Sequence, residues 1–397
     1  MNDLPKPDYT GQGLLNLMSS LIEARGWVSA HPPLAGLDLE DLKRVTNLIL
    51  LVIDGLGDAW LARHAPDGIL SRARIGAISS VFPPTTTSAI ATVLTGCSPL
   101  EHGLTGWFTY FAELGAVLAV LPGRPRYGGV SYRRAGIDPQ RLLGLPSLFD
   151  RIQTRGIALA PGWIADSDFN RALIGCGEVY GFDSLEEMFN RTLRLIRPRR
   201  RWGRWRISQE RRYLYLYWPR LDAIGHEQGI ESAAAQVHLA EIEQALEGFL
   251  SAAKDTDTVL VVTADHGQID VEPQAVIDLA DHPALAECLV LPLCGEPRAA
   301  WAYVRAGAQQ RLESYCRDRL DGIIEPAPSH ELIAEGYLGP GPAHPRIWER
   351  VGDYCLLPRE GYIIRHTLPL EERLVQIGVH GGLSTAELWV PLCAFWL

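Results

Sequence analysis

Aspartate and histidine residues occur in four separate places along the chain, each at or just after the end of a segment that predicts a strand. They are Asp54, Asp222 with His226, Asp265 with His266, and His380. Each one alone has an ordinary structural explanation, such as a turn, a loop cap or a hydrogen-bonded histidine. Two features of spacing favour metal binding: an Asp-x-x-x-His pair within one predicted glycine-containing loop, and an adjacent Asp-His pair. A mixed Asp/His set without cysteine suits zinc best, with manganese or iron as alternatives.

A hydroxyl cluster, Thr85-Thr86-Thr87-Ser88, follows two prolines and precedes an apolar run that continues to Gly96. This order predicts the end of a strand and the start of a helix, because Ser or Thr is the usual cap and proline suits a first turn. A hydroxyl there also faces free N–H groups and the positive end of the helix dipole, which favours phosphate or sulfate. Alone, the cluster predicts only a capping residue. Beside two metal ions, it predicts a threonine nucleophile that attacks phosphorus.

The segments that must position these side chains predict a mostly parallel α/β sheet. Asn47–Ile53 and Thr258–Ala264 are aliphatic runs typical of strands buried on both faces, and they lead directly into Asp54 and Asp265. The carboxyl ends of such strands are where open α/β sheets place their chemistry. Other predicted elements are a strand at Tyr213–Trp218 and helices at Gly13–Ala24, Ser184–Ile196 and Glu231–Ala253.

The pattern changes between about residues 283 and 366. Short strands, a helix over Gln309–Leu320 and the loop Gly339-Pro340-Gly341-Pro342 predict a small α+β insertion over the main sheet. We therefore expect a catalytic core of residues 1–282 and 367–397 and an insertion of residues 283–366. A chain of 397 residues is long enough for one large α/β domain with such an insertion.

Composition indicates where the protein is located and which partners it lacks. The formal net charge of −10 argues against a general nucleic-acid binder. Seven scattered cysteines without a CxxC pair indicate reduced thiols, not disulfides or a zinc knuckle. The N-terminus lacks the pattern of a signal peptide, and no apolar run reaches the roughly 20 residues of a membrane span. We expect a cytoplasmic protein with no stable nucleic-acid partner and no transmembrane segment.

One segment departs from this composition. Residues 197–212 interleave arginine with Trp202 and Trp205, a pattern that can contact phosphate groups or membrane surfaces. A solvated loop between a helix and a strand is the preferred interpretation. The alternative is a basic loop that folds over a cleft and contacts a polyanionic substrate.

Taken together and in chain order, the motifs resemble the type I phosphodiesterase / nucleotide pyrophosphatase branch of the alkaline phosphatase superfamily. The motifs are Ile53-Asp54-Gly55, Phe82-Pro83-Pro84-Thr85-Thr86, Leu94-Thr95-Gly96 with His102-Gly103, Asp222-x-x-x-His226, Thr263-Ala264-Asp265-His266-Gly267 and His380-Gly381-Gly382. The resemblance runs from about Asn47 to the C-terminus. It implies an alkaline-phosphatase-like α/β/α sandwich with a mostly parallel central sheet.

The resemblance also implies a role for each site residue. Thr86 would be the nucleophile, since its distance to Thr95-Gly96 fits and its two neighbouring threonines are each out of register by one. One divalent ion would be held by Asp54, Thr86, Asp265 and His266. The other would be held by Asp222, His226 and His380. The implied activity is hydrolysis of phosphodiester or pyrophosphate bonds in a small phosphorylated substrate through a covalent phospho-threonine, with zinc preferred and manganese possible.

One residue departs from the family pattern. Nucleotide pyrophosphatases carry a phosphoryl-binding Asn where this chain has Trp107, which bears on nucleotide specificity more than on the metals. Thr87, Ser88 or a helix-start N–H are the substitutes considered. His102 is interpreted as a structural histidine in preference to a substrate contact.

Two other interpretations remain beside the leading one. A phosphomonoesterase or phosphonate-type hydrolase would use the same site, although the lack of a recognisable magnesium-type third site favours diesters. A non-catalytic metal-binding protein would keep the ligands without the reaction. No motif indicates an oligomeric state.

Overall fold

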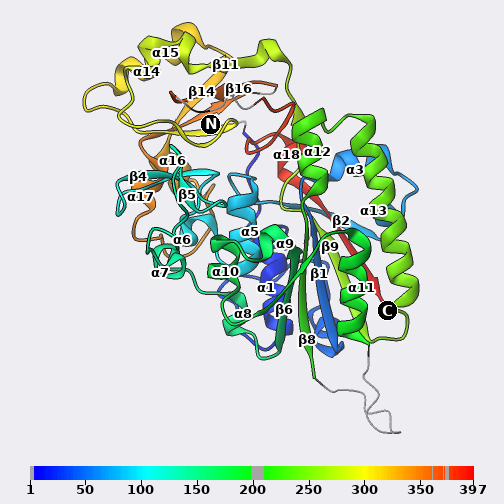
Figure 1. The fold of residues 1–397 in the computed structure, drawn as a ribbon. Helices are drawn as coiled ribbons and strands as arrows, with labels where there is room; N and C mark the ends of the chain where they lie inside the picture. Colours follow the sequence, from blue (N-terminus) through cyan, green and yellow to red (C-terminus); the bar gives the residue numbers. More distant parts are fainter. Residues whose placement is uncertain (1–3, 198–209, 360, 370, 372–374) are drawn as a thin grey trace.

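Seven strands form the central sheet of the computed structural model, which describes residues 4–197, 210–359, 361–369, 371 and 375–397 (Figure 1). Their order is β2-β18-β9-β1-β8-β6-β7. They are β1 (Asn47–Ile53), β2 (Arg74–Ser79), β6 (Arg155–Pro161), β7 (Glu178–Phe182), β8 (Arg212–Trp218), β9 (Thr258–Thr263) and β18 (Trp389–Trp396). The pairs β1–β8, β1–β9, β6–β7 and β6–β8 are parallel, whereas β18 is antiparallel to β2 and β9. The predicted α/β class with a mostly parallel central sheet is confirmed.

Helices cover both faces of this sheet (Figure 1). One layer includes α1 (Leu14–Ala24), α5 (Thr86–Thr95), α8 (Leu148–Arg151) and α10 (Asp168–Ile174). The other includes α3 (Asp58–His64), α11 (Leu185–Ile196), α12 (Arg220–Gln228) and α13 (Ala233–Ala252). Every residue of β1, β8 and β9 is buried, because their apolar side chains meet a helical layer on each face. Shorter helices are α2 (Leu39–Arg44), α4 (Ile69–Arg72), α6 (Pro99–His102), α7 (Pro139–Leu143), α9 (Gly162–Ala165) and α18 (Thr385–Leu388).

A second, antiparallel sheet of seven strands has the order β14-β15-β13-β12-β3-β4-β5. Its strands are β3 (Phe108–Phe111), β4 (Ala116–Ala119), β5 (Arg124–Pro125), β12 (Cys294–Glu296), β13 (Ala299–Ala302), β14 (Ile324–Pro328) and β15 (Tyr354–Pro358). Residues 283–366 therefore do not build this sheet alone, since three of its strands come from residues 108–125. The predicted boundaries at 282 and 367 stay a prediction.

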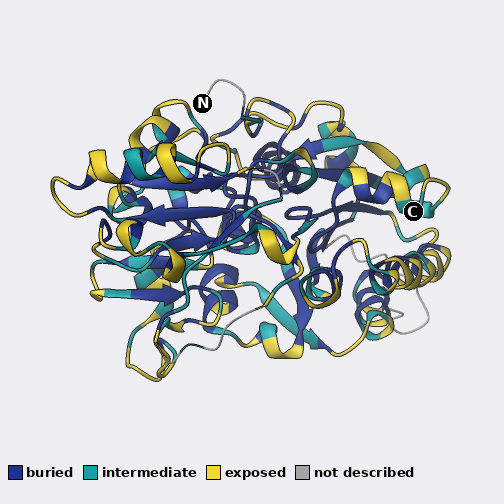
Figure 2. Cartoon of the chain, turned by 90° about the horizontal axis from the view of Figure 1, so that it is seen from above, coloured by how far each residue is buried: buried dark blue, intermediate teal, exposed yellow. Residues whose placement is uncertain are grey.

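Further short elements lie outside these two sheets. They are α14 (Pro283–Ala286), α15 (Gln309–Arg319), α16 (Ser329–Ala334), α17 (Ile347–Val351), β10 (Ile269–Asp270), β11 (Val276–Asp278), β16 (Ile363–Arg365) and β17 (Gly378–Val379). In Figure 2 the strands are mostly buried, and exposed residues gather on helices and loops at the periphery. Among the described residues, no helix has the length and apolar character to cross a membrane. Residues 198–209 of the basic segment 197–212 lie outside the described residues.

A buried ion pair joins the second sheet to the central one. Arg298, in the turn between β12 and β13, donates from Nε (3.1 Å) and Nη2 (2.7 Å) to the carboxylate of Glu387 in α18. Both side chains are almost completely buried. Burial raises the pKa of Glu387, but the Arg298 guanidinium, together with hydrogen bonds from Ser384 and the Gly382 N–H, holds the pKa below its usual range. The pair fixes the hairpin of the second sheet against the segment that precedes β18.

Replacing Glu387 with alanine leaves the Arg298 guanidinium buried without its carboxylate. We expect the free energy of unfolding, measured by urea denaturation, to fall by about 3–5 kcal/mol. The exposed pair Lys43–Glu40 (2.8 Å) provides the control, because Glu40→Ala should cost less than about 1 kcal/mol. Equal losses in the two variants would show that the buried pair stabilises no more than a surface pair.

His102 lies inside the fold, at the end of the short helix α6. Its Nδ1 accepts a hydrogen bond from the Leu104 N–H (3.1 Å), and its Nε2 lies 3.2 Å from Thr92 Oγ1. Burial lowers the pKa of His102 to about 3. A neutral, fully buried and hydrogen-bonded ring agrees with the structural role expected for this residue.

This histidine should make the protein sensitive to acid. Below pH 6.5 the unfolded chain protonates His102 and the folded chain does not, so the folded state loses stability as pH falls toward 3. Between pH 7 and 5, His102→Gln should remove up to about 2 kcal/mol of the fall in the free energy of unfolding. Urea denaturation at both pH values measures this, with the exposed His330→Gln as control. An unchanged pH dependence in His102→Gln would contradict the assignment.

Candidate active site

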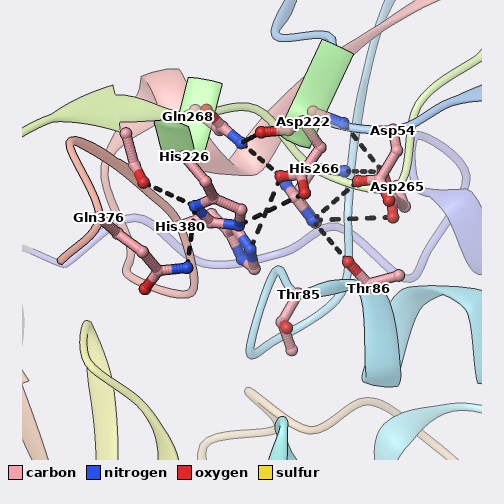
Figure 3. A network of polar contacts seen from close by, with 12 residues as sticks. Asp54, Thr85, Thr86, Asp222, His226, Asp265, His266, Gln268, Gln376 and His380 are labelled. Atoms are coloured by element: carbon pink, nitrogen blue, oxygen red, sulfur yellow. Dashed lines mark hydrogen bonds and ion pairs between the residues drawn. The ribbon is translucent and has the colours of Figure 1, made fainter. Parts of the chain in front are cut away.

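The predicted site residues converge at the carboxyl ends of the central strands (Figure 3). Asp54 follows β1 and Asp265 lies two residues beyond β9, so the parallel pairing of these strands brings both carboxylates to one edge. Asp222 is in α12, directly after β8, the neighbour of β1 on its other side. Thr86 begins α5, and His380 follows β17. The strand order β9-β1-β8 therefore assembles residues that are far apart in the sequence.

One cluster contains Asp54, Asp265 and His266, whose ligand atoms all lie within 4.8 Å of one another. His266 Nε2 lies 3.3 Å from Asp54 Oδ1 and 3.7 Å from Asp265 Oδ2. The hydroxyl of Thr86 joins the cluster, with its Oγ1 3.2 Å from the same His266 Nε2. The half-buried nucleophile candidate thus lies beside three buried ligand candidates.

A second cluster contains Asp222, His266 and His380. Asp222 Oδ2 lies 3.3 Å from His226 Nε2, and Asp222 Oδ1 lies 3.9 Å from His380 Nε2. The rings of His266 and His380 stack with centroids 3.7 Å apart, so His266 lies between the two clusters. The structure thus brings all of the predicted site residues together. Their division between two metal ions stays a prediction.

The electrostatics of the clusters fit a divalent cation. Burial raises the pKa of Asp54 well above its usual range, and the charges of Asp265 and Asp222 raise it further. Burial also raises the pKa of Asp265 and, with two neighbouring histidines, lowers the pKa of His380. Asp54 Oδ1, Asp265 Oδ2 and His380 Nδ1 are buried without a hydrogen-bond partner among the described residues. Oxygen and nitrogen donors of this kind suit a cation, which would relieve the repulsion between the carboxylates.

The prediction of a loop at Leu221–His226 is wrong, because this segment belongs to helix α12. Four-residue spacing places Asp222 and His226 on one face of the helix. Gly225 suggested a loop, but in the helix it lets the Gln268 side chain pack closely against the backbone. A Cβ at this position would collide with that side chain. Gln268 Nε2 in turn donates to the carbonyl of Asp222 (3.1 Å) and to its Oδ1.

Several supporting residues were not predicted from the sequence. The Tyr217 hydroxyl donates to Asp54 Oδ2 from the neighbouring strand β8. His226 Nδ1 lies 2.7 Å from the carbonyl of Gly378, which places the proton on Nδ1 and leaves the lone pair of Nε2 for a metal. The alternation of tyrosines along β8 was a visible signal for Tyr217. That Tyr217 contacts Asp54 follows only from the pairing of β8 with β1, which the sequence does not show.

Glu296, at the end of β12, is another buried carboxyl that no motif marked. Burial raises its pKa to about 7, although hydrogen bonds from the Thr85 hydroxyl and the Trp107 N–H oppose the shift. The sequence could not associate it with the site, because it enters from the second sheet.

Comparisons with known proteins agree with this geometry. Residues 48–382 match the family model of type I phosphodiesterase / nucleotide pyrophosphatase. No curated protein matches the chain. Murine ectonucleotide pyrophosphatase/phosphodiesterase 5 is similar in structure, with a TM-score of 0.63, 16% identity and 87% of each chain covered. Phosphonoacetate hydrolase from Sinorhizobium meliloti, in complex with phosphonoformate, has a TM-score of 0.62 and 18% identity, over 87% of this chain and 89% of that one.

At these identities the structural likeness establishes the fold, and it agrees with the predicted alkaline-phosphatase-like architecture. The family model spans most of the chain, from β1 to the glycines after His380. The protein therefore belongs to the type I phosphodiesterase / nucleotide pyrophosphatase family, a hydrolase family of the alkaline phosphatase superfamily.

Proposed function

We propose that this hydrolase cleaves phosphodiester or pyrophosphate bonds of a small phosphorylated substrate, with Thr86 as the nucleophile. The observation that carries the proposal is the position of the Thr86 hydroxyl, 3.2 Å from His266 Nε2 at the meeting point of the two Asp/His clusters. Its place at the start of α5 also directs backbone N–H groups toward a bound phosphoryl group.

Two divalent ions would be held by these clusters, with zinc preferred and manganese as the alternative. Asp54, Thr86, Asp265 and His266 would hold one ion, and Asp222, His226 and His380 the other. Such ions lower the pKa of a hydroxyl and neutralise charge on the phosphoryl oxygens. The protein orients the ligands through Tyr217, Gln268 and the Gly378 carbonyl.

In the proposed reaction, Thr86 Oγ1 loses its proton to solvent and forms a bond to phosphorus. The bond from phosphorus to the leaving oxygen breaks, and the leaving oxygen keeps the electron pair. The product is a covalent phospho-threonine, which water then hydrolyses. A solved structure of the murine relative, described as an inactive threonine-to-alanine variant in complex with AMP, supports a threonine in this role.

A phosphonate-type hydrolase or phosphomonoesterase is the second candidate. It is favoured by the bacterial phosphonoacetate hydrolase, whose fold is about as similar to this chain as that of the nucleotide pyrophosphatase. A non-catalytic metal-binding role is the weaker alternative, since a nucleophile accompanies the ligands. A cytoplasmic location is part of the proposal, supported by the free thiols of all seven cysteines.

The nucleophile is tested by replacing Thr86. We expect Thr86→Ala to lower kcat for bis-p-nitrophenyl phosphate at least about 10³-fold, because no covalent intermediate can form. Thr86→Ser keeps a hydroxyl and should retain measurable turnover. Hydrolysis of p-nitrophenyl phosphate, measured in parallel, decides between the diester and monoester candidates. Full activity in Thr86→Ala would exclude this nucleophile.

The metals are tested by chelation. Removing them should abolish hydrolysis and lower the free energy of unfolding by about 4 kcal/mol, as expected when a ligand at roughly 1,000 times its Kd is lost. Zinc or manganese should restore both properties, and elemental analysis should find roughly two ions per chain. Asp222→Asn should bind fewer ions. Undiminished activity in metal-free protein would contradict the proposal.

A further inference from the structure

The start of α5 lacks the hydrogen bond that its first residue usually makes. Thr85 is the N-cap, with extended backbone angles (φ −142°, ψ 151°). A threonine hydroxyl at this position ordinarily accepts a hydrogen bond from the N–H of the second or third helical residue. Here the side chain of Thr85 makes no such bond, and its hydroxyl donates to Glu296 Oε1 at 2.6 Å.

The consequence is a set of free N–H groups next to the proposed nucleophile. The first N–H of α5 with a backbone acceptor is that of Ala89, which donates to the carbonyl of Thr85 (2.9 Å). Among the described residues, no hydrogen bond uses the N–H groups of Thr86, Thr87 or Ser88. These groups lie at the positive end of the helix dipole, where an anion is stabilised.

Glu296 is held firmly enough to fix the Thr85 hydroxyl. Its side chain is 8% exposed, and Oε1 also accepts the Trp107 N–H at 2.7 Å. Its Cβ and Cγ pack against Gly381, where an added Cβ would lie 2.8 and 3.0 Å from them. One carboxyl of the second sheet thereby contacts the start of α5, the segment around Trp107 and the loop after His380.

We propose that Glu296 is a positioning residue that withholds the Thr85 hydroxyl from the start of α5 and so leaves the first N–H groups of the helix for the transferred phosphoryl group. The inference rests on the proposed function, since it assigns these groups to the same substrate. It also accounts for a phosphoryl contact in a chain that has Trp107, 38% exposed, where an asparagine donor was expected.

The test is a set of variants in which a substitution at Thr85 should restore the activity lost by a substitution at Glu296. In Glu296→Ala the Thr85 hydroxyl becomes free to cap α5, and a capping bond of about 1 kcal/mol should lower kcat about fivefold. In the double variant Glu296→Ala/Thr85→Val no hydroxyl competes, and kcat should recover most of the loss. Glu296→Gln keeps an acceptor oxygen and should stay within about twofold of wild type. Thr85→Val alone should lose less than Glu296→Ala.

The affinity for inorganic phosphate, measured by calorimetry on the metal-loaded variants, should follow the same order as kcat. A purely structural role for Glu296 predicts the opposite, a double variant at least as impaired as Glu296→Ala. That result, with hydrolysis still dependent on Thr86, would overturn the positioning role and leave the proposed function intact. If hydrolysis does not depend on Thr86 but phosphate affinity follows the predicted order, the proposed function fails and the role of Glu296 in anion binding stands.

Discussion

The repulsion between three carboxylates is the constraint on which the rest of the site depends. Asp54, Asp265 and Asp222 come from three neighbouring segments of the central sheet, and the first two are fully buried. Such a cluster is unfavourable without a cation, and the pKa of Asp54 is raised accordingly. The buried apolar strands β1, β8 and β9 hold the ends together against this repulsion. The fold thereby brings the carboxylates of the candidate cation site together before any cation binds.

The second sheet contributes residues that pack against the loop after His380. Its β12–β13 hairpin carries Glu296 and Arg298, which approach the two glycines after His380. A Cβ on Gly382 would lie 2.8 Å from Arg298 Nη2, and Gly381 has a positive φ of 110°. The His-Gly-Gly motif therefore follows from close packing, since larger residues would push the hairpin away from the loop.

Polar residues outside the clusters orient three of the candidate ligands. The Gly378 carbonyl fixes the proton of His226 on Nδ1, and Tyr217 occupies one oxygen of Asp54. Gln268 holds the backbone and the carboxylate of Asp222. Ligands held in this way lose little orientational freedom when a metal binds, which favours tight and geometrically specific sites.

Local patterns in the sequence were enough for the fold class and for naming candidate site residues that the structure brings together. The aliphatic runs at Asn47–Ile53 and Thr258–Ala264 predict buried parallel strands, because period and composition are properties of a short segment. Parallel strands end at one edge, so the residues after them were expected to meet, and Asp54 and Asp265 do. The hydroxyl cluster likewise predicts the start of α5.

Only the tertiary structure decided which residues support that site. Glu296 lies 211 residues from Thr85, and Tyr217 acts on a residue of another strand, so no local pattern connects either pair. The segment at Leu221–His226 is helical although its glycine suggested a loop. The glycine is there because Gln268 packs closely against it, a contact between residues far apart in the sequence. The sequence by itself determined which groups are candidates for the chemistry, since strand ends and motifs are local. The order of the strands and the docking of the second sheet decided their partners, because such contacts arise only when distant segments pack.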